Sequence, residues 1–151
     1  MCAIIGWTGH LPKGLLSSLL TLSGSRGKDS TGLSFYGNFE RYETGPDGKS
    51  KKVMASGHGT HRKAIEPSEY VKQHQTSIKA ARMSPVGIGH TRRASPGMPI
   101  DEYNAHPFKY WDFHFAHNGR VENWLDLKDT LDEHFWGIAE TKAKATLSPL
   151  G

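Results

Sequence analysis

The chain has 151 residues, a hydrophobic content of 36% and a mean hydropathy of −0.58, which describe one polar domain that can still bury a core. No apolar run approaches the roughly 20 residues that cross a bilayer, no signal peptide is recognisable, and a single cysteine excludes an internal disulfide framework, so we expect a cytoplasmic protein. The net charge of +4 is compatible with a nucleic-acid partner, but basic residues are spread among acidic ones, so this interpretation ranks last.

The N-terminal part predicts a strand followed by an amphipathic helix. Residues 3–8 are a short apolar run typical of a buried strand. Pro12 stands where a helix can begin, and leucines then recur at helical spacing until the glycines of "SGSRG" at 23–27 end the pattern. Core packing accounts for these leucines, so we expect an amphipathic helix of about three turns. They are Leu15, Leu16, Leu19, Leu20 and Leu22.

The middle of the chain predicts a hairpin, a further strand and a second helix. "GLSFYG" at 32–37 and "RYETG" at 41–45 are expected to pair through a turn at "GNFE". "GKSKK" at 48–52 follows Pro46 and Asp47 and predicts a solvated turn, and the segment 51–57 predicts another strand. "GHGTHRK" at 57–63 is expected to be a polar loop. Pro67 opens a helix that extends to about residue 82.

The C-terminal half predicts two strands and a third helix, which makes the fold class α+β. "VGIGHTRR" at 86–93 and "FHFAHNG" at 113–119 are expected to be strands that end in polar residues. Asn123 is expected to cap the third helix. The core stripe of this helix is Trp124, Leu127, Leu131 and Phe135. Trp7, Trp111 and Phe113 are expected to be core residues.

Cys2 directly follows the first methionine, and its position alone leaves two interpretations open. A free cysteine behaves as a small buried hydrophobe, and the residues after Cys2 continue as a strand would. Alternatively, removal of Met1 makes Cys2 the first residue, with a thiol and a free α-amine together. The amine can then take the proton of its own side chain, as the amine of N-terminal threonine nucleophiles does.

Three polar, glycine-bearing segments follow apolar elements, which is where a rigid scaffold presents chemistry. They are "SRGKDSTG" at 25–32, "GHTRRASPG" at 89–97, and "NAHPF" with "AHNGRVEN" between 104 and 123. Together with the opening "MCAIIG", they resemble the glutaminase domain of class II glutamine amidotransferases, which are N-terminal nucleophile hydrolases; the sugar-phosphate aminotransferases look nearest. The resemblance covers residues 2–140, implies a four-layer αββα sandwich and favours Cys2 as a nucleophile.

The resemblance implies a role for each matching residue. Cys2 would attack the side-chain amide carbon of glutamine, with its own α-amine as base. Asn118, through its side-chain amide, and Gly119, through its backbone N–H, would form the oxyanion hole, where one donor is typically worth about 3–4 kcal/mol. Arg92 would clamp the α-carboxylate of glutamine, because its planar fork matches a carboxylate.

Two more residues are assigned to substrate binding by the resemblance. Ser95 matches a position that lines the glutamine pocket, and Arg26 is expected to brace the loops around Cys2 more than to touch glutamine. His90 and His117 are expected to orient loops.

Neither a cofactor nor a metal is assigned. The spacings His58-x-x-His61 and His114-x-x-His117 are compatible with a metal, but the chain has one cysteine and no helical His-Glu-x-x-His motif.

The sequence departs from the family pattern at several positions. Ala3 replaces a glycine, Arg93 stands where tryptophan or tyrosine is common, and Pro96 replaces a residue that is often histidine. Arg93 therefore alters one wall of the expected pocket.

The family's aspartate that grips the amino group of glutamine is also missing. Its position falls on Lys142 or Leu147, depending on the register, and Glu140 is the nearby carboxylate. We therefore expect weak glutamine binding. Residues 141–151 are expected to be a divergent C-terminal tail, and the sandwich is expected to be truncated.

The leading hypothesis is a glutaminase that releases ammonia from L-glutamine and passes it to a separate synthase subunit. The alternative is a catalytically impaired relative that acts as a partner-binding or regulatory module. The missing aspartate supports the alternative, whereas Cys2, Arg92, Asn118 and Gly119 support the enzyme.

Overall fold

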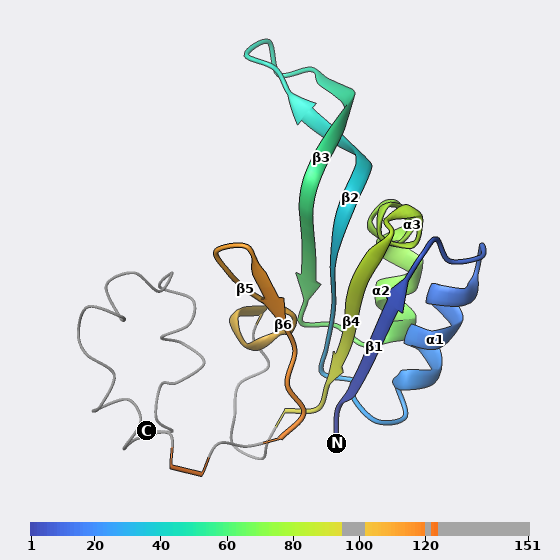
Figure 1. Cartoon of the computed structure of the whole chain (residues 1–151), viewed down its shortest axis with the longest axis vertical. Helices are drawn as coiled ribbons and strands as arrows, with labels where there is room; N and C mark the ends of the chain where they lie inside the picture. Colours follow the sequence, from blue (N-terminus) through green and yellow to red (C-terminus); the bar gives the residue numbers. More distant parts are fainter. Residues whose placement is uncertain (95–101, 120–121, 124–151) are drawn as a thin grey trace.

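The computed structural model describes residues 1–94, 102–119 and 122–123, and its central feature is a four-stranded antiparallel sheet (Figure 1). The strand order is β1-β4-β2-β3. The three helices cover one side of this sheet, and a short 3-10 helix and a two-stranded hairpin lie on the other (Figure 1). The sheet comprises β1 (Ala3–Thr8), β2 (Ser30–Thr44), β3 (Ser50–Lys63) and β4 (Val86–Arg92). The remaining elements are α1 (Leu15–Ser23), α2 (Pro67–Gln73), α3 (Gln75–Met83), η1 (Glu102–Asn104), β5 (Phe108–Tyr110) and β6 (Phe113–Phe115).

This arrangement confirms the α+β class, with antiparallel sheets. The finer prediction of an αββα sandwich stays a prediction. The third predicted helix, the residues assigned to its stripe, and the tail at 141–151 lie outside the described residues. No helix in the described part of the chain has the length and apolarity to span a membrane.

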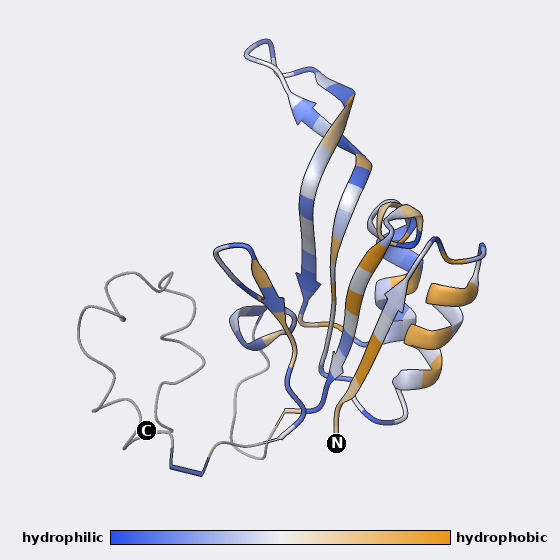
Figure 2. Cartoon of the chain, in the orientation of Figure 1, coloured by the Kyte–Doolittle hydropathy of each residue, from blue (hydrophilic) through white to orange (hydrophobic). Residues whose placement is uncertain are grey.

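The core lies between the helices and the sheet. Leu16 and Leu20 of α1 are fully buried against Leu33 of β2, and the hydrophobic colour of α1 and β1 in Figure 2 marks this layer. Burying one leucine side chain typically contributes about 1.5–3 kcal/mol. The predicted stripe is therefore confirmed at its centre, while its edge residues Leu15 and Leu22 remain exposed.

The predicted turn at "GNFE" is wrong. β2 runs without interruption from Ser30 to Thr44, and the residues 38–41 pair with 53–56 of β3. The hairpin turn lies at 45–49 instead, where the N–H of Gly48 bonds the carbonyl of Gly45. The segment 57–63, expected to be a loop, belongs to β3 for the same reason: cross-strand pairing overrides the local preference of glycine and polar residues for turns.

The predicted helix at 67–82 is two helices. The backbone leaves the helical conformation at His74, which has φ −119° and ψ 42° and lies between α2 and α3. The His74 ring packs against the rings of His61 and Tyr70. This cluster of three rings lies at the break between the two helices. The spacing of apolar residues in the sequence does not reveal the break.

Two further predictions are wrong on the hairpin side of the sheet. The strand expected at 113–119 ends at Phe115, and the residues 116–119 leave it toward the N-terminal end of β1. Trp111 and Phe113, expected in the core, are 67% and 73% exposed in the described structure, because they lie on the small β5–β6 hairpin rather than between sheet and helices. Trp7 is buried, as predicted.

Candidate functional site

Cys2 lies immediately before β1, beside the last residues of β4. Antiparallel pairing of β1 with β4 sets Ala3 opposite Thr91, which brings the residue before Ala3 next to the chain that follows β4. The backbone N–H of Arg93 points at the Cys2 sulfur, with N and Sγ 3.4 Å apart. An N–H donor aimed at sulfur stabilises the negative charge that a thiolate carries. The thiol is half-buried and free of any disulfide.

The loop after α1 holds this end of the sheet together. The Nε–H of Arg26 donates to the Cys2 carbonyl oxygen, 3.2 Å away. Gly27 packs so closely on β4 that an added Cβ would lie 2.5 Å from the Thr91 carbonyl oxygen, which only glycine allows. Asp29 bonds β4 and its continuation twice: its N–H donates to the Arg92 carbonyl, and its carboxylate accepts the N–H of Ala94.

Asn118 reaches the same place from the segment after β6. Its Nδ2 donates to the carbonyl oxygen of Cys2 at 3.2 Å, and its Oδ1 lies 2.9 Å from Nε2 of His90. Asn118 is followed by Gly119, whose φ of +153° falls in a region that side chains rarely adopt. A primary amide therefore contacts the residue that carries the thiol, and a glycine follows that amide in the chain.

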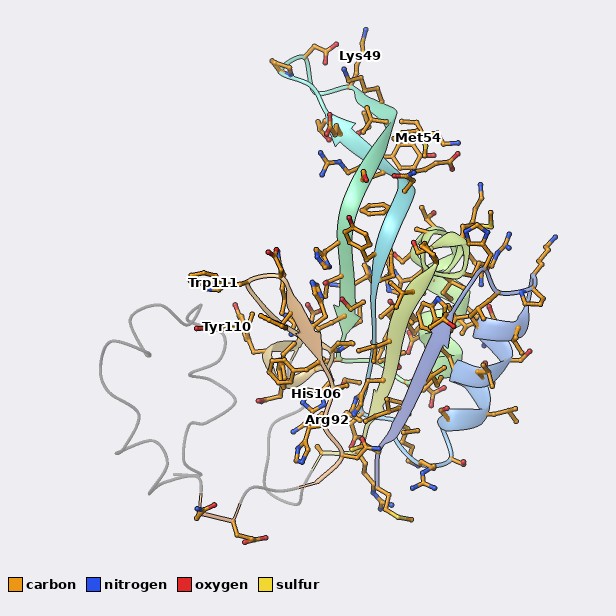
Figure 3. The ribbon with its side chains drawn as sticks, in the orientation of Figure 1. Lys49, Met54, Arg92, His106, Tyr110 and Trp111 are labelled. Atoms are coloured by element: carbon orange, nitrogen blue, oxygen red, sulfur yellow. The ribbon has the colours of Figure 1, made fainter. Side chains whose placement is uncertain are left out.

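Arg92 ends β4 and supplies a cation beside this cluster. Its Nη1 is buried and has no hydrogen-bond partner within the described residues. Figure 3 shows Arg92 beside His106, below the β5–β6 hairpin and at the end of the sheet where the N-terminus lies. A buried guanidinium donor without a partner is costly unless a ligand accepts its hydrogen bond, so Arg92 suits an anionic group.

A fully buried histidine, His90, and a half-buried one, His106, lie next to each other beside Asn118. His90, fully buried in β4, and His106 lie with Nε2 and Nδ1 3.2 Å apart and their rings packed edge to face. Burial, followed by the nearby charges of His90 and Arg92, lowers the pKa of His106 to about 3. Burial likewise lowers the pKa of His90. Both rings are therefore neutral in neutral solution.

The contacts join three of the six residues predicted from sequence. Cys2, Arg26 and Asn118 meet through the Cys2 carbonyl, and the role of Arg26 as a brace stays a prediction. Gly119 adjoins Asn118, and Arg92 adjoins the Arg93 backbone that contacts the sulfur. Ser95 lies outside the described residues.

Sequence reasoning gave no role to two residues that the structure places in the cluster. Asp29 lies in the quoted motif "SRGKDSTG", and His106 lies in "NAHPF". Both residues therefore belong to motifs that the sequence analysis singled out. The contacts of Asp29 with Ala94 and of His106 with His90 are visible only in the structure.

The two histidine spacings do not produce a metal site in the described residues. His58 and His61 lie three positions apart in β3, so their side chains project to opposite faces of the sheet. His58 stacks on His114, whereas His61 packs against Tyr70. No group of three or more potential metal ligands occurs among the described histidine, cysteine and acidic side chains.

A cavity of about 680 Å³ lies away from Cys2, at the opposite end of β4. α3 and the β2–β3 ribbon line it, through residues that include Phe39, Met54 and Lys79. Neither Cys2, Arg92 nor Asn118 contributes to its walls, so it is not the pocket expected around the candidate nucleophile.

No family model matches the chain, but curated proteins named glutamine–fructose-6-phosphate aminotransferase [isomerizing] are similar to it. The Aquifex aeolicus protein is 31% identical over 134 residues, which are 87% of this chain and 19% of that protein. The Rhizobium leguminosarum bv. viciae protein is 34% identical over 136 residues (88% and 19%), and the Thermus thermophilus protein is 37% identical over 136 residues (87% and 19%).

The chain thus spans about a fifth of the length of these relatives. Each of these relatives is one polypeptide whose name contains both glutamine and fructose-6-phosphate. These relatives therefore do not support the expected separate synthase subunit.

Proposed function

Because the chain is homologous to the N-terminal class II glutamine amidotransferase domain of glutamine–fructose-6-phosphate aminotransferases, we propose that it hydrolyses the side-chain amide of glutamine and releases ammonia. The observation that carries the proposal is the hydrogen bond from Asn118 to the Cys2 carbonyl. It joins the residue that we propose as nucleophile to the residue that we propose as oxyanion donor, 116 positions away in the chain.

The first step is attack by the Cys2 thiolate on the amide carbon of glutamine. Once Met1 is removed, the α-amine of Cys2 takes the thiol proton. The new C–S bond moves the carbonyl electron pair onto oxygen, and the Asn118 side-chain N–H and Gly119 backbone N–H donate to that oxyanion. Donors that are oriented before the reaction begins need no reorganisation during it.

The second step breaks the C–N bond. The electron pair returns from the oxyanion, the ammonium form of the α-amine gives its proton to the leaving nitrogen, and ammonia departs. The product on the protein is a thioester between Cys2 and the glutamyl side chain. Water then adds to this thioester, which yields glutamate and restores the thiol.

Arg92 and its neighbours hold the substrate in this scheme. The buried Nη1 of Arg92, which has no partner among the described residues, donates to the α-carboxylate of glutamine, and Ser95 lines the pocket beside it. Arg26 holds the backbone of Cys2 in place through its carbonyl oxygen. Residues 2–140 form the glutaminase domain in this proposal, and 141–151 the divergent tail.

The test is ammonia release from L-glutamine by the wild-type chain and by Cys2→Ala. Cys2 does not belong to the buried core cluster, so its replacement removes no packed core side chain. We expect ammonia from the wild type, none from Cys2→Ala, and covalent labelling of the wild type alone by a glutamine-like electrophile. Thermal unfolding checks that both proteins fold. Equal release from both would contradict the proposal.

The alternative, a catalytically impaired relative that binds a partner or regulates it, gives a different result. A wild-type chain that folds and has a free N-terminal Cys2, but releases no ammonia and resists the electrophile, would favour the alternative.

A further inference from the structure

We propose that His90 is a positioning residue that fixes which way the Asn118 side-chain amide faces, so that the nitrogen of the amide points toward Cys2 and the oxygen away from it. The inference rests on the proposed function for its catalytic consequence. Its structural content, the orientation of one amide, stands on contacts that do not depend on activity.

The contacts of His90 Nε2 favour a proton on that nitrogen. His90 Nε2 lies 2.9 Å from Oδ1 of Asn118, and an amide oxygen can only accept, so the proton must be on Nε2. The other ring nitrogen, Nδ1, is buried without a partner in the described part of the chain. A buried nitrogen that carries only a lone pair is tolerated better than an unpaired buried N–H, which favours the same tautomer.

His106 supports this tautomer. Its Nδ1 lies 3.2 Å from His90 Nε2. Partial burial, the largest cause, and the positive guanidinium of Arg92 lower the pKa of His106 and keep its ring neutral. Its Nδ1 can therefore share the proton of His90 as a second acceptor, with its own proton on Nε2. No charged imidazolium is needed anywhere in the chain of contacts.

The orientation matters because the two ends of an amide have opposite chemistry. With Oδ1 held by His90, Nδ2 faces the Cys2 carbonyl oxygen, 3.2 Å away, and donates one of its two hydrogens to it. The second hydrogen is left for the oxyanion. A flipped amide would set its oxygen against the Cys2 carbonyl and against the developing negative charge, and it would repel both.

The burial of His90 holds its ring in a fixed position. His90 is 0% exposed and sits between two paired strands, with β1 on one side of β4 and β2 on the other. Its backbone therefore cannot follow the segment after β6. Asn118 belongs to that segment, and the hydrogen bond to His90 ties it to the central strand.

The test combines amide spectroscopy with a double-mutant cycle. In nitrogen-resolved NMR of the wild type, we expect the Asn118 side-chain protons to be slow to exchange with water, and we expect His90→Leu to abolish that protection. The side-chain amide of Asn38, exposed like Asn118 but located at the opposite end of the sheet from His90, is the internal reference and should not change. Unprotected Asn118 protons in the wild type, or protection that survives in His90→Leu, would overturn the inference whether or not the chain is active.

The kinetic arm measures the consequence for turnover. Removing one oxyanion donor typically lowers kcat by about 10²- to 10³-fold, so we expect His90→Leu to lower kcat by about that factor, with little change in KM. Alkylation of Cys2 by iodoacetamide creates no oxyanion and should keep its wild-type rate. His90→Gln, which can still present an N–H, should restore part of kcat.

The variant Asn118→Ala closes the cycle. If His90 acts through Asn118, His90→Leu should cost nothing further in the Asn118→Ala background, because interacting residues are not additive. Fully additive losses would overturn the inference. If His90→Leu does not fold, His90→Gln and Asn118→Ala carry the same comparison. A wild-type chain without ammonia release would refute the proposed function, and the NMR arm would still decide the role of His90.

Discussion

Arg26 donates its Nε–H to the Cys2 carbonyl oxygen, 3.2 Å away, and that oxygen also accepts the side-chain amide of Asn118. Two donors from distant parts of the chain therefore fix the peptide group of the residue that would become the N-terminus. The Arg26 guanidinium also lies 3.8 Å from the sulfur of Met1. Loss of Met1 would leave the bonds at the Cys2 carbonyl intact, because neither involves Met1.

The first prediction concerns the free α-amine of Cys2. A preparation whose N-terminus is Cys2 should release ammonia from glutamine, whereas one that retains Met1 or carries an acetyl group on Cys2 should not, because an amide nitrogen is not a base. Mass spectrometry of the intact protein assigns the N-terminus of each preparation. Comparable activity with Met1 retained would show that another group takes the thiol proton.

The second prediction concerns Arg92. A hydrogen bond to a charged group typically contributes about 1.5–3 kcal/mol, so Arg92→Ala should raise KM for glutamine by roughly ten- to a hundredfold and change kcat less. Arg92→Lys should recover part of the loss, since it keeps the charge without the fork.

Arg93→Ala is the matched control for Arg92. It removes an exposed neighbouring guanidinium but keeps the backbone N–H that contacts the Cys2 sulfur. A rise in KM of the same size in Arg93→Ala would show that Arg92 has no special part in binding.

The third prediction concerns stability in acid. Burial, with smaller contributions from His74 and Lys63 and an opposing one from Glu102, lowers the pKa of His61 from 6.5 to about 4. The folded chain therefore binds fewer protons than the unfolded chain below pH 6.5. The stabilisation present above pH 6.5 should be lost progressively as the pH falls to about 4.

Urea unfolding between pH 7.5 and 4.5 checks this loss. His61→Asn cannot titrate but can still bond the Tyr70 hydroxyl, which lies 2.7 Å from His61 Nδ1, so its urea midpoint should fall less than that of the wild type. His10→Asn, at an exposed position, is the control and should follow the wild type. An identical fall in His61→Asn would exclude His61 as a source of the pH dependence.

The fourth prediction concerns the missing carboxylate, at positions outside the described residues. Lys142→Asp should lower KM for glutamine more than it changes kcat, because ground state and transition state both carry the ammonium group. Leu147→Asp tests the other register in the same assay. If neither changes KM, the ammonium is held by a different group.

The elements closest to the site were the most predictable. β1, α1 and β4 have a clear apolar period, and the structure confirms each of them to within a few residues. The motifs at their ends were visible because cysteine, arginine, asparagine and glycine stand at the places where strands stop. Contacts between these motifs, such as His90 with Asn118, required the fold.

The wrong predictions share a physical cause. At Gly37 and Asn38 the local sequence favours a turn, but a partner strand was available in 53–57 and pairing continued. Trp111 and Phe113 are apolar, but the small hairpin that carries them leaves their side chains largely exposed in the described structure. Local composition reports a preference, whereas burial and pairing depend on neighbours distant in the chain.

The bond between Cys2 and Asn118 also has a consequence for the order of folding. It closes a loop of 116 positions, whereas α1 and the β2–β3 ribbon form mainly from contacts close in sequence. Long loops cost more chain entropy to close and form late, so the local elements can assemble before the candidate site exists. We expect the same contact to be among the first to open under mild denaturant, since the segments it joins lie at the margins of the sheet. Catalytic activity would then be lost while the helices are still folded. Turnover would therefore report loss of the native fold earlier than a measurement of helix content.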